Sequence, residues 1–453
     1  MMTRVMEGDE TIAALATAPG RAGLAIVRVS GDRAFELADR LCVSAKQPPS
    51  RQAPGTFRLV RLSDERGVFL GDAIVLVFHA PHSYTGENVV EFQVHGGRQI
   101  VSRLLSSLFS LGAVPAGPGE FTRRAFLHGR IGLEQAEAVM DLVDARSERA
   151  SRMAAEQLSG SLGVRVNALY DELIALCADI EATLDFTDDD ISGLIPPDQA
   201  SRRLDKLLVP LRNLADTVRE GHLLREGALV VLAGPVNAGK STLFNALLGT
   251  NRSIVNSTPG TTRDTIEETL VLGGIPLRLV DTAGLRDTEN EIESEGIHRA
   301  ETLLETADLV LVLRDDGEVL PKLNSKTAVL RVWTKSDETP PPDETMLAVS
   351  AKTGAGLDAL RTAMVRAIGA DPEGTSSSHD TEVAVSERHE HLIRQAIQKL
   401  EMARETYEQG AEEAAVPVAA HLRDAAESLG QITGRTYSED LLNTVFGRFC
   451  IGK

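Results

Sequence analysis

Aromatic residues are scarce in this sequence: they make up 4% of its 453 residues, and only one of them is tryptophan. This scarcity argues mildly against a surface that stacks many nucleic-acid bases. Only three cysteines occur, Cys42, Cys177 and Cys450, and they lie far apart with no CxxC pair. We therefore expect neither a zinc site nor a disulfide scaffold, and a reducing cytoplasm fits this composition.

Long apolar runs are also missing. No stretch of about 18 apolar residues occurs, so we expect no membrane-spanning helix, and the N-terminal segment lacks the apolar core of a signal peptide. Positive charge is in deficit, with a formal net charge of −19. Such a balance repels phosphate backbones. If RNA is a substrate, a local basic patch or a partner must hold it.

The length of the chain predicts two or three domains. Apolar runs at residues 24–29, 73–78 and 89–94 predict strands, and the leucine spacing in residues 99–111 predicts an amphipathic helix, so the N-terminal part is read as α+β. Helical patterns then flank an α/β pattern, and we expect the two helical segments to pack on each other. The predicted domains are residues 1–128 (N-terminal), 129–221 (first helical part), 222–375 (inserted α/β domain) and 376–453 (second helical part).

A phosphate-binding motif opens the α/β region. The apolar run 229–233 leads into the G-x-x-x-x-G-K-S sequence of residues 234–241, and an apolar helical segment follows. In this context the glycines let backbone N–H groups surround phosphates at a helix N-terminus. Lys240 is expected to reach the β- and γ-phosphates, and Ser241 to ligate Mg²⁺. The flanking strand and helix argue against the alternative of a chance glycine-rich turn.

Further elements follow in the order that a GTPase needs. Thr262 lies in a G-T-T-R-D loop that would supply a threonine to contact Mg²⁺ and the γ-phosphate, and Asp281 opens a D-T-A-G motif after an apolar strand. The T-K-S-D and S-A-K sequences resemble guanine-reading loops. The predicted GTP-binding residues are Asn237, Ala238, Gly239, Lys240, Ser241, Thr242, Asn256, Ser257, Thr258, Pro259, Gly260, Thr261, Thr262, Asp281, Thr282, Ala283, Gly284, Thr334, Lys335, Asp337, Ser350, Ala351 and Lys352.

Two positions depart from the usual GTPase pattern. Thr334 stands where Asn is usual, and its hydroxyl can do only part of what the Asn amide does, although Asp337 can still accept the two N–H donors of guanine. Leu285 stands where a water-orienting Gln is common, so catalysis must draw on another group. One of the charged residues that follow could activate the water. Alternatively, these residues form only the solvated start of a helix. The candidates are Arg286, Asp287, Glu289, Glu291, Glu293 and Glu295.

Motifs outside the α/β region make the whole chain resemble the MnmE (TrmE) family of tRNA-modification GTPases. They are T-A-P-G-R (17–21), R-V-S-G (28–31), S-Y-T-G-E (83–87), H-G-G (95–97), P-G-E-F-T (118–122), R-A-F-L (124–127) and the terminal F-C-I-G-K (449–453).

The resemblance implies a one-carbon folate, 5-formyl- or 5,10-methylene-tetrahydrofolate, bound in the N-terminal domain. By position, the folate-contacting residues would be Arg28, Glu91, Arg130 and Lys453. Two cations suit the folate carboxylates, and Glu91 could accept N–H bonds from the pterin. Without the resemblance, a lone Arg28 would be read as a surface charge. Cys450 is either a nucleophile or a small residue in an apolar tail.

The resemblance also implies that K⁺ activates hydrolysis while two GTPase domains pair across a homodimer. Asn237 would ligate K⁺ together with Asn256, Thr258 and Thr261. Glu293 would activate the water, with Lys240 and Thr262 completing the catalytic set.

A heterotetramer with the FAD- and NADH-dependent partner MnmG (GidA) would modify C5 of the wobble uridine of certain tRNAs in the cytoplasm. The product implied is an aminomethyl or carboxymethylaminomethyl group. Two alternatives are a GTPase that switches partners during ribosome assembly and a pure folate-binding protein. The folate-type N-terminal motifs argue against the first, and the complete set of GTPase elements argues against the second.

Overall fold

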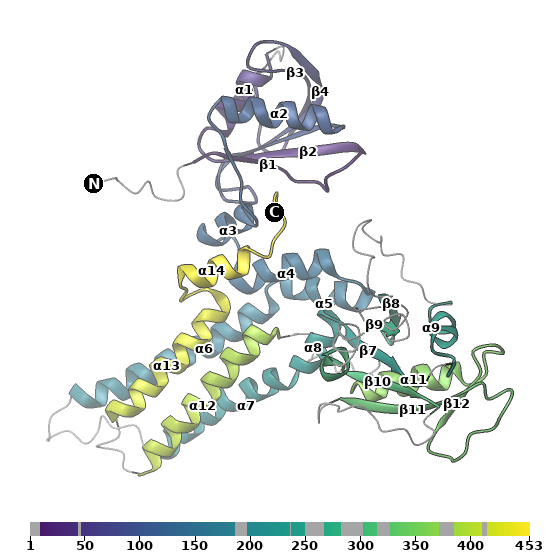
Figure 1. The fold of residues 1–453 in the computed structure, drawn as a ribbon. Helices are drawn as coiled ribbons and strands as arrows, with labels where there is room; N and C mark the ends of the chain where they lie inside the picture. The colour runs from purple at the N-terminus through teal and green to yellow at the C-terminus, as the bar shows by residue number, and fades with distance from the viewer. Residues whose placement is uncertain are drawn as a thin grey trace, which may run out of the picture. The chain divides into compact units, whose positions relative to one another are not determined.

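The computed structural model describes residues 10–43, 47–185, 197–235, 237–249, 267–281, 302–314, 327–370, 385–409 and 415–453 (Figure 1). Contacts divide the chain into two compact units, one formed by Met1–Met140 with Gly430–Lys453 and the other by Asp141–Leu429. The fold class predicted from the sequence is confirmed: an α+β domain, a helical region and an α/β domain inserted into it.

The first unit contains a six-stranded sheet with the strand order β3-β4-β5-β2-β1-β6. Neighbouring strands pair antiparallel, except that β1 and β6 run parallel. The three predicted strands and the predicted helix are all confirmed. The elements are β1 (Ile12–Leu15), β2 (Ala22–Ser30), α1 (Ala34–Leu41), η1 (Pro49–Arg51), β3 (Phe57–Ser63), β4 (Phe69–Phe78), β5 (Val89–Gly96), α2 (Arg98–Ser110), β6 (Val114–Pro115), α3 (Glu120–Leu127) and α14 (Glu439–Phe446).

One face of this sheet is covered by α1 and α2. Leu37 of α1 and Leu104 of α2 are fully buried in one apolar cluster with Val27 and Phe92 of the sheet. Each such side chain contributes about 1.5 to 3 kcal/mol through removal of apolar surface from water. From Ala73 to Phe78 of β4 the burial alternates from residue to residue, as it does in a sheet with one face on a core.

A buried ion-pair network joins the loop after β4 to the end of β2 and to α3. The Arg124 guanidinium donates to Glu87 at 3.0 Å and to Glu120 at 2.9 Å, and only 9% of the Arg124 side chain is exposed. The hydroxyl of Ser30 donates to the Glu87 carboxylate at 2.6 Å. Four of the motifs quoted above therefore meet in one network, and buried charges of this kind are tolerated only when paired.

The C-terminal tail packs on α3. Phe446 and Phe449 are buried in a cluster with Phe126, Leu133 and Leu442, so the apolar tail docks on a core. The Gly119 N–H donates to the Cys450 carbonyl at 3.4 Å, and the Phe121 N–H donates to the Lys453 carbonyl at 3.2 Å. The tail thus satisfies backbone donors at the N-terminus of α3, which have no partner within that helix.

Long helices make up the part of the chain on either side of the inserted domain. Ser147 separates α4 from α5, because its hydroxyl accepts from the Ala150 N–H at 3.1 Å and so caps α5. The helices are α4 (Leu133–Asp144), α5 (Glu148–Leu158), α6 (Ser161–Asp185), α7 (Pro197–Asp216), α8 (Val218–Arg225), α12 (Glu387–Gln409) and α13 (Ala415–Thr433).

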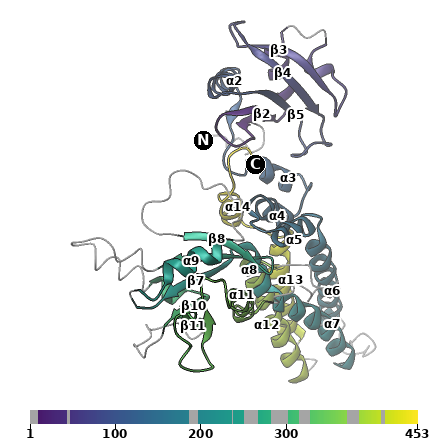
Figure 2. The ribbon, with the colours of Figure 1, turned by 90° about the vertical axis from the view of Figure 1, so that its right-hand side faces the viewer.

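The two helical segments pack on each other, as predicted. In Figures 1 and 2 α12 lies along α7 and α13 along α6. The Cys177 thiol of α6 lies 3.8 Å from the Ala419 carbonyl of α13. Arg212 of α7 pairs with Glu401 of α12 at 2.5 Å. Helices separated in sequence by the whole inserted domain therefore pack directly on each other.

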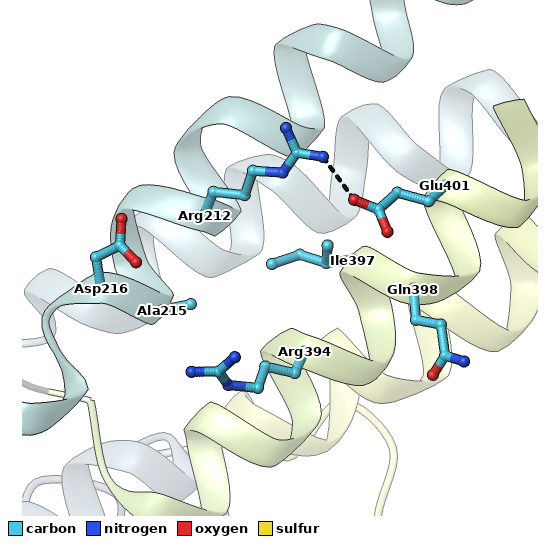
Figure 3. Close-up of a pocket in the computed structure, with 7 residues that line it drawn as sticks. All are labelled: Arg212, Ala215, Asp216, Arg394, Ile397, Gln398 and Glu401. Atoms are coloured by element: carbon cyan, nitrogen blue, oxygen red, sulfur yellow. Dashed lines mark hydrogen bonds and ion pairs between the residues drawn. The ribbon is translucent and has the colours of Figure 1, made fainter.

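A groove of about 260 Å³ runs between α7 and α12 (Figure 3). Three of its charged lining residues form ion pairs: Arg212 bonds Glu401 across the groove, and Arg394 bonds Glu390 at 2.8 Å on its own helix. The remaining lining residues are Ala215, Asp216, Ile397 and Gln398.

The inserted domain is a six-stranded sheet with the order β12-β11-β10-β7-β9-β8. All pairs are parallel except β8 with β9, which forms an antiparallel edge. All six residues of β7 are buried, as expected of a parallel strand covered on both faces. The elements are β7 (Ala228–Ala233), α9 (Lys240–Leu248), β8 (Glu267–Leu272), β9 (Ile275–Asp281), β10 (Leu309–Leu313), β11 (Ala328–Thr334), β12 (Leu347–Val349) and α11 (Leu357–Ala367).

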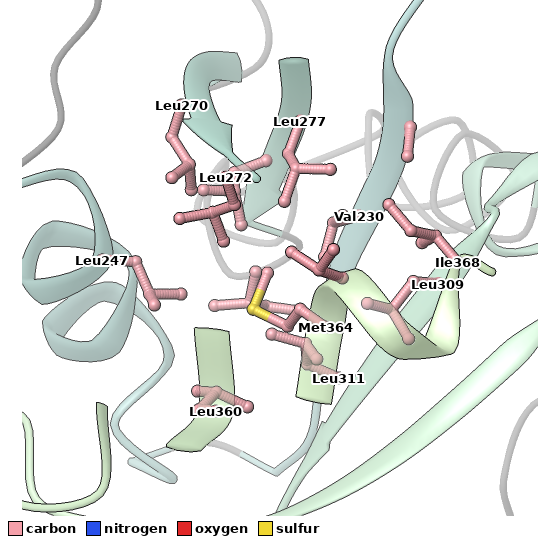
Figure 4. Close-up of a cluster of buried hydrophobic side chains, with 14 of the residues drawn as sticks. Val230, Leu247, Leu270, Leu272, Leu277, Leu309, Leu311, Leu360, Met364 and Ile368 are labelled. Atoms are coloured by element: carbon pink, nitrogen blue, oxygen red, sulfur yellow. The ribbon is translucent and has the colours of Figure 1, made fainter. Parts of the chain in front are cut away.

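The main core of this domain lies between the sheet and the helices α9 and α11 (Figure 4). Leu247 of α9 and Met364 of α11 are fully buried against Val230, Leu277 and Leu311 of the strands. From α5, Ala150 joins the same cluster. The inserted domain is thus anchored to the helical region through packing.

Two of the three cysteines are buried. Burial raises the pKa of the Cys42 thiol to about 12 and that of the Cys177 thiol to about 11, so both remain protonated at neutral pH. Cys450 is exposed. Among the described residues, no helix is both long and apolar enough to cross a membrane.

Candidate functional site

The loop between β7 and α9 has the backbone conformation of a tight phosphate-type turn. Asn237 and Gly239 both adopt left-handed conformations, with φ of 66° and 86°. Gly234 is fixed by close approach, because a Cβ at this position would lie 2.5 Å from the Leu313 carbonyl oxygen of β10. Glycine is required there by space as well as by its φ of 149°.

Lys240 begins α9 and is buried, with 8% of its surface exposed. Its ammonium group donates to the carbonyls of Gly234 and Pro235, both at 2.8 Å. The side chain is therefore folded back over the loop, which places a positive charge beside the N-terminus of α9. Both features favour an anion at this point.

The next residue, Ser241, meets the end of β9. Its hydroxyl donates to the Asp281 carboxylate at 2.7 Å, and Asp281 is buried. A hydroxyl and a carboxylate oxygen beside a phosphate-type loop are hard oxygen donors of the kind that Mg²⁺ takes in combination with phosphate oxygens. The two residues present therefore fit a magnesium ion held between the protein and a nucleotide.

Thr334 ends β11 and reaches the same loop. Its buried hydroxyl donates to the Ala238 carbonyl at 2.5 Å. The position that departs from the usual Asn therefore still links the guanine-type loop to the phosphate-type loop. A buried carbonyl deprived of this donor would cost about 1 to 3 kcal/mol.

Asp337 and the loop after β12 face each other. A hydrogen bond from Ser350, with a further contribution from nearby Lys352, holds the pKa of the Asp337 carboxyl below its usual range. The Ser336 N–H donates to the Val349 carbonyl at 3.2 Å, and Lys335 adopts φ of 55°. An ionised, exposed carboxylate is what would accept the two N–H donors of guanine.

Several predicted residues lie outside the described part of the chain, and their roles stay predictions. They are Asn256, Ser257, Thr258, Pro259, Gly260, Thr261, Thr262, Thr282, Ala283, Gly284 and Glu293, together with Leu285, Arg286, Asp287, Glu289, Glu291 and Glu295. The described residues of the predicted set gather at the carboxyl ends of β7, β9, β11 and β12, where open parallel sheets bind ligands.

A second constellation lies on β2 and β5 in the first unit. Arg28 pairs with Glu91 across the two strands at 2.8 Å, and the two side chains are 20% and 14% exposed. The guanidinium of Arg28 also lies 5.4 Å from the ring centres of both Tyr84 and Phe121. Arg28 is thus held by a carboxylate and two aromatic faces, and it orients Glu91. The sequence alone favoured a surface charge.

The other predicted residues of this site lie close by. A Cβ at Gly86 would lie 3.5 Å from Cγ of Arg130, so this exposed arginine packs over the loop that carries Tyr84. Lys453 is bonded through its carbonyl to Phe121, whose ring stacks on Arg28. The tail and Arg28 therefore both contact Phe121.

Two glycines of the quoted motifs are explained by close approach. A Cβ at Gly452 would lie 2.1 Å from the Leu15 carbonyl oxygen, and one at Gly31 would lie 2.7 Å from Oγ1 of Thr11. The first fits the tail against β1. Cys450 is exposed while Phe449 is buried, so Phe449 carries the packing of the tail.

Two arginines important to these sites were not found from the sequence. Arg124 has no marker beyond its place in a quoted motif. Arg314 follows β10 and bonds the Thr334 carbonyl, and it belongs to no motif. The only tryptophan of the sequence, Trp333, lies directly before Thr334, and it was the one feature that could have drawn attention to this region.

Comparison with known families agrees with this arrangement. Residues 11–130 match the family described as the GTP-binding protein TrmE N-terminus, and residues 133–450 match the MnmE helical domain. This chain belongs to the MnmE family. The family assignment covers the N-terminal domain, the helical region and the domain inserted into it.

Curated relatives are similar over nearly their whole length. A protein named tRNA modification GTPase MnmE from Bordetella parapertussis is 44% identical over 98% of this chain and 99% of its own length. Proteins of the same name from Alkalilimnicola ehrlichii and Akkermansia muciniphila are 43% and 40% identical, each over 98% of this chain and 99% of their own length.

The Thr334 hydroxyl gives a direct test of the nucleotide site. Thr334→Val keeps the shape of the side chain but leaves the Ala238 carbonyl without its donor. We expect the GDP dissociation constant to rise about tenfold, on the order of 1.4 kcal/mol, as measured by calorimetry. Thr334→Ser keeps a hydroxyl and should bind GDP like the parent protein. Parental affinity in Thr334→Val would show that the hydrogen bond plays no part in binding.

Proposed function

We propose that this GTPase of the MnmE family modifies the wobble uridine of certain tRNAs at C5 and that it uses a tetrahydrofolate one-carbon unit. The observation that carries the proposal is the presence in one chain of two constellations: the nucleotide-type loops around Lys240 and Thr334, and the Arg28–Glu91 pair with its closing tail. The product would be an aminomethyl or carboxymethylaminomethyl uridine. The proposed domains are residues 1–128, 129–221, 222–375 and 376–453.

In the nucleotide site the roles follow from contacts and from position. Lys240 would hold the β- and γ-phosphates, while Ser241 and Thr262 would ligate Mg²⁺. Asp337 would read guanine, supported by the Ser350 hydrogen bond that keeps its carboxyl ionised. Mg²⁺ supplies charge neutralisation for phosphoryl transfer when it is bound. Glu293 would activate the attacking water, because Leu285 cannot.

K⁺ would complete this site. We propose Asn237 as its ligand in the phosphate-type loop, together with Asn256, Thr258 and Thr261. Asn237 lies within this loop in a left-handed backbone conformation, with φ of 66°. A monovalent cation beside the phosphates can stabilise developing charge. Pairing of two GTPase domains in a homodimer would then drive the cycle.

The folate would bind at Arg28, Glu91, Arg130 and Lys453. The Arg28–Glu91 pair suits the pterin, because a carboxylate oriented by a guanidinium can accept N–H bonds. Arg130 is exposed and cationic and suits a glutamate carboxylate. The sequence-based expectation gave that role to Arg28 as well, but its pairing with Glu91 favours an orienting role. Cys450 stays a candidate nucleophile, and its exposure is compatible with that role.

The partner would be the FAD- and NADH-dependent protein MnmG (GidA), in a cytoplasmic heterotetramer. A net charge of −19 is compatible with a partner that supplies much of the tRNA-binding surface. The competing function, a GTPase of ribosome assembly, would leave the Arg28–Glu91 site without a role.

The decisive experiment is mass spectrometry of wobble nucleosides from a strain that lacks the gene. The C5-modified uridine should disappear and should return with a plasmid copy of the parent protein. Lys240→Ala, which removes the phosphate-contacting charge, should fail to restore it. Unchanged wobble nucleosides in the deletion strain, with altered ribosome profiles, would favour the assembly function.

Hydrolysis should depend on K⁺. At equal ionic strength, the steady-state GTPase rate should be far higher in KCl than in NaCl. Asn237→Gly removes the amide while tolerating the left-handed backbone, and it should lose most of the difference between the two salts. Equal parental rates in KCl and NaCl would exclude the K⁺ site.

Removal of Gly452 and Lys453 should weaken folate binding and leave hydrolysis intact. Calorimetry should show a loss of 5-formyltetrahydrofolate affinity of tenfold or more, on the order of 1.4 kcal/mol, because the tail contacts Phe121 beside Arg28. The K⁺-stimulated GTPase rate serves as the control and should stay nearly unchanged.

Gly452→Ala provides a matched variant of full length. Its Cβ would clash with the Leu15 carbonyl and displace the tail, so it should reproduce the effect of the deletion. Parental folate affinity in both variants would refute a role for the tail, and a parallel loss of GTPase activity would indicate misfolding.

A further inference from the structure

Arg314 occupies a strained backbone position directly after β10. Its φ is 47°, in the left-handed region that side chains other than Gly, Asn and Asp rarely adopt. Such a conformation persists only where the surroundings determine it. Here the Arg314 N–H donates to the Val332 carbonyl of β11 at 3.0 Å, which continues the ladder one residue past the strand.

The side chain of Arg314 turns from this position onto the guanine-type loop. Nε and Nη2 both donate to the Thr334 carbonyl, at 3.2 and 3.1 Å, and Nη2 also lies 3.3 Å from Oγ1 of Thr339. The guanidinium lies 5.0 Å from the centre of the Trp333 ring. One half-buried arginine therefore binds the start and the end of the segment 334–339.

The same segment is closed by a second bond between its ends. The indole N–H of Trp333 donates to the Thr339 carbonyl at 2.9 Å. Inside the loop, the N–H groups of Glu338 and Thr339 donate to the Lys335 carbonyl at 2.9 and 3.2 Å. Asp337 lies within this closed turn, so its direction depends on the two residues that hold the ends, Arg314 and Trp333.

We propose that Arg314 is a positioning residue for guanine recognition: it fixes the 334–339 turn from behind and so aims the Asp337 carboxylate, without contacting the nucleotide. This inference rests on the proposed binding of guanine nucleotides. It deepens that proposal by assigning base selectivity to a residue outside the motif.

Thr at position 334 makes this support more important. The Thr334 hydroxyl makes its bond to the Ala238 carbonyl, and its own carbonyl is held by Arg314. The residue is thus fixed on one side by the phosphate-type loop and on the other by β10. Gly234 packs against the Leu313 carbonyl, directly before Arg314, so the end of β10 sets the spacing of both loops.

The test compares GDP with IDP, which lacks the exocyclic amino group whose N–H would donate a hydrogen bond to Asp337. The dissociation constants are measured by displacement of fluorescent GDP from the full-length protein. Arg314→Ala should raise the GDP constant about tenfold and the IDP constant less, so that the preference for GDP falls about threefold or more. Arg314→Lys keeps the charge but loses the fork and the stacking, and it should be intermediate.

Arg366→Ala is the matched control, because Arg366 is an exposed arginine on α11 of the same domain. It should match the parent protein in both constants. Unchanged constants in Arg314→Ala would overturn the inference. An equal loss of both nucleotides with a lowered melting temperature would also overturn it, because that pattern reports general destabilisation. If the parent protein binds neither GDP nor IDP, the proposed nucleotide function itself fails.

Discussion

The parallel register of the inserted sheet is the constraint on which the nucleotide site depends. Leu232 pairs with Asp281, Ala233 with Val312, and Thr334 with Val349. The phosphate-type loop, the Asp281 carboxylate, Arg314 and the guanine-type loop therefore leave the sheet at the same level. A shift of any strand would carry its loop away from the others, because each residue along a strand advances about 3.3 Å. The strand pairing brings these loops close together, and side-chain hydrogen bonds such as that from Thr334 to Ala238 then fix their positions.

The N-terminal site is organised by charges instead of strand ends. Arg28 and Arg124 are both shielded from solvent, and each is paired with carboxylates from another element. Since desolvating an unpaired charge is costly, each pair fixes the relative positions of the segments it joins. Arg28 joins two strands and two aromatic rings, while Arg124 joins a loop, a strand end and a helix. The quoted motifs of this domain therefore include residues that build the site as well as residues that would touch a ligand.

Much of this architecture could be predicted from the sequence. The apolar run of residues 229–233 marked a strand, because both faces of a parallel sheet are buried. Spaced glycines marked the phosphate-type turn. What could not be predicted depends on tertiary contacts. From the sequence, Arg28 was expected to be a cation available to a ligand. Its pairing with Glu91 could not be predicted, because it depends on the register between β2 and β5. Arg314 has no local signature, and the cap at Ser147 that divides α4 from α5 lies inside a continuous helical pattern.

The approach of Gly452 to Leu15 has a consequence for the order in which the protein forms during synthesis. The β1 strand leaves the ribosome early, yet the segment that packs against its end is separated from it by 437 residues (452 minus 15). At a translation rate of about 5 to 20 residues per second, roughly 20 to 90 s pass between the two. Until residues 450–453 have been synthesised, the donors of α3 that Cys450 and Lys453 satisfy must be met by water. The N-terminal domain therefore lacks part of its packing until the helical region and the inserted domain have both been translated.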